Sequence, residues 1–185
     1  ESCKKISYLF PRAHAVAYVM MAFRIAWFKV YHPLAFYAAY FSIRAKAFDL
    51  RIMTGDLKTQ MTEFNRIKAL DRAASPKDKD LMSALEVSME MYQRGYRFVN
   101  VDIQHSEARR FSIKDGALLP PFLAIDSLGE TVADAIVAER EERPFTSLKD
   151  LQRRCKVSNT IIDLMKDLKC CGELPEDEQM SLFGA

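Results

Sequence analysis

The sequence has little net charge and no long uncharged apolar run, and each absence excludes a class of protein. Its 185 residues carry a formal net charge of +2, so any binding of nucleic acid must come from local basic patches. The apolar stretch 13–43 is interrupted by Arg24 and Lys29 and broken by Pro33, whereas a bilayer span needs about 20 consecutive apolar residues. We expect a buried helix pair here and no membrane partner.

Metal-binding cysteine spacing and a targeting signal are also missing. The cysteines Cys3, Cys155, Cys170 and Cys171 show no C-x-x-C spacing, which argues against a zinc ribbon and favours a reduced, cytoplasmic chain with inert thiols. No apolar run ends at a small-residue cleavage site. The first residue is not methionine, and patterned sequence begins at once, which indicates a piece of a longer protein.

The periodicity predicts a mainly α-helical fold with a small β-hairpin element. We expect a central helix over 13–31, which is apolar on nearly every side, and a second helix that begins at Pro33. Helical spacing recurs over 57–70, and a further helix should run from Ser75 to a C′ glycine at Gly95. Segments 96–103 and 109–120 alternate like strands, and Asp115–Gly116 predicts a hairpin turn. Short helices follow.

A turn at Ser127–Glu130 is the sharpest motif in the body of the chain. It opens into the expected helix of "ETVADAIVAERE", and backbone N–H groups at a helix N-terminus bind anions. In a helix-hairpin-helix such a turn donates to DNA phosphate oxygens whatever the base. The candidate residues are Ser127, Leu128, Gly129 and Glu130. Ser127 replaces the first of two usual glycines, and Glu130 would repel phosphate; an ordinary helix corner is the alternative.

A second, looser copy follows at 153–168. Apolar residues recur at helical spacing there, Ser158 or Asn159 could cap the helix, and cations precede it. The candidate DNA-binding residues are Arg153, Arg154, Lys156 and Ser158. A solvated basic face is the alternative interpretation.

The first helix carries a different chemistry. Lys4, Lys5 and Arg12 precede or open it, and His14 lies near its start with Tyr18 one turn later. Cations and aromatic rings at a helix N-terminus can hold a triphosphate and stack on a base. The alternative is a core of aromatic side chains with a solvated basic rim.

Two long stretches resemble bacterial replicative DNA polymerases of the C family. That family's fingers segment contains F-x-K-x-H-x-x-A-Y, then Trp or Tyr, Lys, and His-Pro or Tyr-Pro. The matching residues here are Phe10, Arg12 (in place of Lys), His14, Ala17, Tyr18, Trp27, Lys29, His32 and Pro33. Residues 115–174 are similar to the family's tandem helix-hairpin-helix region, and the order of parts fits the PolC type best.

The resemblance implies a fragment of a polymerase with four parts. These are a helical fingers segment (1–95), a small β element (96–119), a tandem helix-hairpin-helix domain that binds duplex DNA (120–174) and a flexible tail (175–185). It implies that Tyr8 borders the incoming base, while Arg12 and His14 reach the triphosphate of a dNTP. Primer-template DNA and the remainder of the polymerase chain are the other implied partners.

The catalytic metal site of this family is expected outside the chain. The family's reaction uses two Mg²⁺ ions held by palm aspartates, and no palm is visible here. Asp78 and Asp80 form a D-x-D, but we place them in the first turn of a helix, where the helix dipole favours acids. The fragment should therefore hold no metal and no catalytic residue, and should not polymerise alone.

The end of the chain resembles the family's peptide for the sliding clamp. In "QMSLF", Gln179 can exchange hydrogen bonds at a pocket rim, and Met180, Leu182 and Phe183 supply apolar anchors. A tail that packs on its own domain is the alternative. The acids at 176–178 should keep the tail soluble and away from basic patches of its own body.

Two other classes of function stay open at this point. A stand-alone, non-catalytic helix-hairpin-helix module explains the basic turns equally well, but it leaves the aromatic, histidine-bearing first helix unexplained. A structural adaptor bound through its tail alone leaves both basic regions idle.

Overall fold

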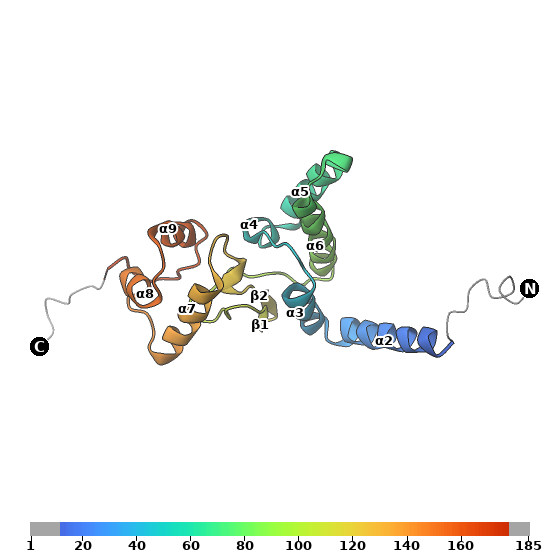
Figure 1. Ribbon diagram of the computed structural model, residues 1–185, viewed down its shortest axis with the longest axis horizontal. Coiled ribbons are helices and arrows are strands. Elements are labelled where there is room, and N and C mark those ends of the chain that lie inside the picture. The colour runs from blue at the N-terminus through green and yellow to red at the C-terminus, as the bar shows by residue number, and fades with distance from the viewer. Residues whose placement is uncertain (1–11, 178–185) are drawn as a thin grey trace, which may run out of the picture.

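A computed structural model describes residues 12–177, with side chains from His14 onward, and its architecture is mainly α-helical (Figure 1). The elements in chain order are α2 (Arg12–Tyr31), α3 (Pro33–Ile43), α4 (Leu50–Met53), α5 (Leu57–Leu70), η1 (Asp71–Ala73), α6 (Pro76–Gln93), β1 (Ser112–Lys114), β2 (Ala117–Leu119), η2 (Phe122–Ala124), α7 (Glu130–Glu142), α8 (Leu148–Cys155) and α9 (Asn159–Asp167). The predicted fold class, helical with one small antiparallel pair, is confirmed.

Local sequence signals place the ends of the helices. Pro33 occupies the first turn of α3. Ser75 and Asp78 form a reciprocal capping box at the start of α6, so Asp78 serves a helix end. At the other end, Gly95 has φ 85°. The N–H of Tyr96 donates to the carbonyl of Met91 at 3.1 Å, as in a Schellman C-cap.

The β element is smaller than the sequence predicts. Lys114 pairs with Ala117, and Asp115 (φ 49°) and Gly116 (φ 75°) form the expected two-residue turn. The predicted strand over 96–103 is wrong: it makes a single bridge, Phe98 to Leu118. Phe98 packs in the same hydrophobic core as Leu118 of β2, whereas Val101 and Ile103 pack in a different one. The segment therefore cannot continue along β2.

Two hydrophobic cores share the chain. The α3–α6 core contains Tyr37, Phe41, Met53, Ile67, Leu81, Ala84, Leu85, Met91, Phe98 and Leu118. The α7–α9 core is built from apolar side chains of 122–171, joined by Leu50, Val101 and Ile103. Phe48 packs against both, and its ring lies 5.2 Å from that of Phe98 and 5.0 Å from that of Phe111. Both of these rings belong to the α3–α6 core, and Phe48 joins that core to the α7–α9 core because it packs against the two.

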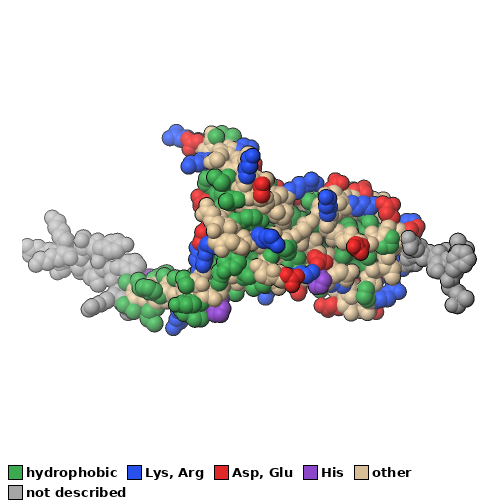
Figure 2. Space-filling model, turned by 180° about the vertical axis from the view of Figure 1, so that it is seen from behind, with side chains coloured by type: hydrophobic (Ala, Val, Ile, Leu, Met, Phe, Trp, Pro, Cys, Tyr) green, Lys and Arg blue, Asp and Glu red, His purple; other side chains and the backbone are tan. Residues whose placement is uncertain are grey.

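Helix α2 projects from the body with apolar side chains in solvent (Figures 1 and 2), so the prediction of a buried central helix is wrong for it. Phe23 is 72% exposed and Trp27 is 49% exposed. Contacts with α6 and the residue after it hold the last turn of α2. The Lys29 side chain pairs with Glu90 at 2.6 Å, and the backbone carbonyl of Lys29 accepts a hydrogen bond from Arg94 at 2.9 Å. Residues 12–177 offer no element that covers its length. None of their helices is long and apolar enough to cross a membrane.

The three cysteines within the described range are free and buried. Burial raises the pKa of the Cys155 thiol to about 11 and that of Cys170 to about 12. Because the thiolate is the reactive species, these side chains act as small apolar residues of the α7–α9 core.

Candidate nucleic-acid interface

Two turns in the α7–α9 region have the same backbone conformation. The first position is left-handed in both, with φ 63° at Ser127 and φ 57° at Lys156. The second is a buried apolar residue, Leu128 or Val157. The third is the N-cap of the next helix, with φ −74° and ψ 155° at Gly129 and φ −72° and ψ 157° at Ser158. The looser second copy is thus a true repeat of the first.

The first position explains why glycine is usual in such turns. A side chain there costs about 1–2 kcal/mol in the left-handed region, and Ser127 and Lys156 both accept that cost. The element before each turn differs. A single 3-10 turn, η2, precedes Ser127, while the full helix α8 precedes Lys156. The second copy is therefore the more complete helix-hairpin-helix.

The first turn presents unpaired backbone donors. Gly129 caps α7 without a side chain. Among residues 12–177, no group accepts from the N–H of Gly129, Glu130 or Thr131, and all three residues are exposed. A Cβ built on Gly129 would meet no atom within 4 Å. The φ of Gly129, −74°, is one that any residue can adopt. The fold itself therefore does not require a glycine at this position.

Arg109 pairs with both acids beside the first turn and cancels one of their two negative charges. It donates to Glu130 at 2.5 Å and to Asp134 at 3.1 Å through Nε, and its hydrogen bond lowers the pKa of Asp134. The repulsion expected from Glu130 is therefore reduced, although one negative charge remains beside the turn. Sequence reasoning missed Arg109 because it lies 21 residues from Glu130 along the chain.

The second turn is the more cationic of the two. Ser158 caps α9 by accepting from the N–H of Ile161 at 3.3 Å, as predicted for this residue. Lys156 is exposed and has no ion-pair partner within the described range. Arg153 is also largely exposed, with 67% of its side chain accessible, and it pairs with Asp150 at 2.9 Å.

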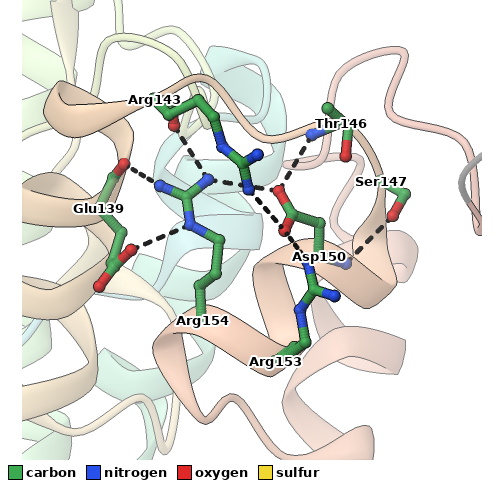
Figure 3. Close-up of polar contacts among 7 residues, drawn as sticks. All are labelled: Glu139, Arg143, Thr146, Ser147, Asp150, Arg153 and Arg154. Carbon is green, nitrogen blue, oxygen red and sulfur yellow. Dashed lines mark hydrogen bonds and ion pairs between the residues drawn. The ribbon is translucent and has the colours of Figure 1, made fainter.

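Arg154 points into the protein and away from the surface of the turn (Figure 3). Only 11% of its side chain is exposed. Its guanidinium donates to the Glu139 carboxylate at 2.9 Å and to the Arg143 carbonyl at 3.0 Å, and also to the Glu139 carbonyl. It lies 4.7 Å over the ring of Phe145. These contacts join α7 to α8, so we leave Arg154 out of the interface.

Asp150 is the buried centre of this network (Figure 3). Its side chain is fully buried, and it accepts from Arg153, from Arg154 at 3.3 Å, from Arg143 at 3.4 Å and from the N–H of Thr146 at 3.3 Å. Burial alone would raise its pKa, but the hydrogen bonds from Arg153, Thr146 and Arg154 outweigh burial and lower it. A buried carboxylate of this kind is not apparent from the sequence.

The predicted nucleotide residues lie at or beyond the N-terminal limit of the description. Arg12 begins α2, and Tyr8, Lys4 and Lys5 lie outside the described residues. His14 is exposed on α2, with its ring edge-on to Tyr18 at 4.4 Å. The triphosphate assignment therefore stays a prediction.

The start of the tail contacts the body. The expectation that its acids avoid the body's basic side chains is wrong for Glu176, which pairs with Lys166 at 2.7 Å, and for Asp177, which pairs with Lys149. The reason is that the carbonyls of 175–176 cap α8 and bring these acids beside the lysines. The predicted clamp residues Gln179, Met180, Leu182 and Phe183 lie outside the described residues.

Comparisons with known proteins agree with the repeated turns. The helix-hairpin-helix motif family matches residues 95–179. The chain is 48% identical over 183 residues to the "DNA polymerase III PolC-type" of Caldanaerobacter subterraneus subsp. tengcongensis. It is 49% identical to the Streptococcus suis protein of the same name and 47% identical to that of Streptococcus pyogenes, each over 186 residues.

Along nearly its whole length, the chain is therefore similar to one segment of PolC-type DNA polymerase III. The matches cover 99% of the chain but only 13% of each relative, so the chain corresponds to a small part of a full-length PolC. Residues 12–177 contain no cluster of three or more His, Cys, Asp or Glu side chains that could hold a metal ion.

Replacing Asp150 by Asn should destabilise the α7–α9 region. Loss of the charge leaves three arginines around a neutral amide, and we expect a loss of about 2–4 kcal/mol in the free energy of unfolding at pH 7. Because the folded pKa of Asp150 is lowered, its contribution is fully present above the unfolded pKa of about 4 and is lost progressively as the pH falls from there through the lower folded pKa. Chemical denaturation across this pH range measures both effects.

The matched control is Asp163→Asn on α9, an exposed acid whose substitution should change stability by less than about 0.5 kcal/mol. Equal effects of the two substitutions at pH 7 would contradict the role given to Asp150.

Proposed function

We propose that this chain supplies a replicative DNA polymerase with sequence-independent grip on duplex DNA. The observation that carries the proposal is the repeated turn. In each copy a buried apolar residue holds the backbone in place, and the first two residues of the helix that follows are exposed, with no acceptor for their N–H groups among residues 12–177. Such donors suit the tetrahedral oxygens of a phosphodiester. They carry no base information, so the grip should be the same on any sequence.

The two turns contribute different forces to this grip. The first has bare N–H groups, and the three side chains beside it, Arg109, Glu130 and Asp134, leave one net negative charge. The second adds the cations Lys156 and Arg153. We assign the main salt-dependent attraction to the second turn and the close backbone approach to Gly129 in the first.

The alternative of a stand-alone DNA-binding module has less support. The chain matches PolC-type relatives along nearly its whole length, including α2. The apolar side chains exposed along α2 suit a helix that packs against the remainder of a longer polymerase chain. We assign the two Mg²⁺ ions of polymerisation to that remainder.

Within the polymerase, we assign the start of α2 to the incoming dNTP and the end of the chain to the sliding clamp. Support for the first assignment is the resemblance of Arg12, His14 and Tyr8 to the fingers motif, with His14 exposed at the helix start. Support for the second is the resemblance of the Gln179-to-Phe183 sequence to the family's peptide for the sliding clamp.

Replacing Gly129 by Val should weaken duplex binding without unfolding the protein. The Cβ of the new side chain would meet no atom within 4 Å, and the side chain would occupy the space through which a phosphate must approach the α7 amides. We expect the dissociation constant for a random-sequence duplex to rise about tenfold, comparable to the loss of one charged hydrogen bond. Fluorescence anisotropy at several salt concentrations measures it.

The control is Thr62→Val. Thr62 is exposed on α5, a helix of the α3–α6 core, and this variant should bind duplex DNA with the affinity of the parent chain. Unchanged duplex affinity for Gly129→Val, with the fold intact, would show that the turn is only a helix corner.

Removing the tail anchors should abolish clamp binding and spare duplex binding. Leu182→Ala combined with Phe183→Ala takes away both large apolar contacts of the peptide, and such anchors carry most of the energy of a short motif. We expect at least about a tenfold weaker clamp affinity by calorimetry. Equal affinity of the parent and the double variant would end the assignment.

Replacing His14 by Ala in the full-length polymerase should raise KM for dNTP more than it lowers kcat. A group that holds the triphosphate in both the ground and transition states contributes uniform binding. Steady-state kinetics with a primer-template measure the split, and Tyr31→Phe on the same helix is the control. A crystal of the full-length enzyme in which the triphosphate lies beyond the reach of both Arg12 and His14 would contradict the assignment.

A further inference from the structure

The segment Leu174–Asp177 is attached to the α8–α9 hairpin by four polar contacts. The N–H of Leu148 donates to the carbonyl of Pro175 at 2.9 Å, and the N–H of Lys149 donates to that of Glu176 at 3.2 Å. The side chains add the pairs Lys166–Glu176, at 2.7 Å, and Lys149–Asp177. Leu174 packs against the α7–α9 core.

These contacts close the N-terminus of α8. The N–H groups of Leu148 and Lys149 are satisfied by the two carbonyls, and that of Asp150 by the Ser147 hydroxyl at 3.0 Å. In α7 the groups that correspond to those of Leu148 and Lys149, on Glu130 and Thr131, have no acceptor among residues 12–177, while the N–H of Val132 donates to the Gly129 carbonyl at 3.1 Å. The carbonyls of 175–176 thus accept from the N-terminal amides of α8, as a phosphate would accept from those of α7. These α8 amides are therefore occupied by the tail and are not available to a phosphate.

The attachment lies at the end of the hairpin that is remote from its turn. Lys149 is in the first turn of α8 and Lys166 is in the last turn of α9, whereas Lys156–Ser158 joins the opposite ends. Eight helical residues span about 12 Å at 1.5 Å per residue. The attached segment Leu174–Asp177 therefore lies about one helix length from the turn Lys156–Ser158.

We propose that Leu174–Asp177 forms a clip that fixes where the terminal peptide starts, so that duplex DNA and a protein partner of that peptide bind at the same time. This inference rests on the proposed function, with the sliding clamp as the partner. The clip holds the start of the peptide away from the DNA-binding turn. It also anchors the chain at Asp177, two residues before Gln179, which raises the local concentration of the peptide near a partner already on the same DNA.

The clip is built to be reversible. Its four charged side chains are exposed by 37–80%, and exposed ion pairs are weak and screened by salt. Release would lengthen the free tether by four residues without disturbing α8, whose N-terminus would still carry the Ser147 cap.

The clip can be tested without any ligand. Combining Lys149→Glu with Lys166→Glu places like charges against Glu176 and Asp177. Hydrogen exchange of the Leu148 and Lys149 amides, followed by NMR at constant pH, should accelerate about 2- to 30-fold, as expected for two weak ion pairs. Adding Glu176→Lys and Asp177→Lys should restore both rates. A glutamate near a helix N-terminus favours the helix, so fraying of α8 would not explain the acceleration.

The control is Lys58→Glu with Lys79→Glu, two exposed lysines whose reversal makes the same change in net charge and should leave both amides unaffected. Unchanged exchange in the Lys149/Lys166 variant, or no recovery in the fourfold variant, would overturn the clip.

Simultaneous binding is tested with the parent chain, a duplex and the clamp. Clamp affinity measured with and without saturating duplex should agree within about twofold. A loss of tenfold or more on adding duplex would overturn the separation of the two sites. Absence of any clamp binding would instead remove the proposed function and with it the partner in this inference, while the exchange rates would still decide whether the clip exists.

Discussion

One buried carboxylate determines how the two turns, Ser127–Gly129 and Lys156–Ser158, are held. Asp150 accepts hydrogen bonds from Arg143, Arg153 and Arg154, and Arg154 in turn reaches back to Glu139 at the end of α7. A charge removed from water is tolerated only when it is paired in this way. The pairing fixes α7 against α8, and each of these helices is continuous with one turn. The basic run "RRCK" thus has two uses: Arg154 builds the scaffold, while Lys156 is left facing solvent.

Much of the fold follows from local patterns, and the errors have physical causes. Pro33, the Ser75–Asp78 box and Gly95 act within a few residues, so sequence alone places these helix ends correctly. Helix α2 was expected to be buried because apolar residues surround it, but periodicity cannot tell which chain segment covers a helix. The segment 96–103 alternates like a strand, yet its apolar residues serve two different cores, and that division depends on the tertiary structure.

The candidate site was predicted in part, for a similar reason. Ser127–Glu130 and Ser158 are recognisable because a turn and a helix cap are local. Arg109 and the clip at Glu176 were missed, since each depends on residues brought together from distant parts of the chain. The contact between Ser127 or Lys156 and DNA remains a prediction, as do the nucleotide and clamp assignments.

The central claim is that the backbone amides of both turns bind phosphate, and amide-detected NMR tests it most directly. A random-sequence duplex titrated into the ¹⁵N-labelled chain should shift the amide signals of Gly129, Glu130, Ser158 and Asn159 together, with equal effects from a second duplex of different sequence. Shifts confined to other surfaces, with these four signals unmoved at saturation, would contradict the account.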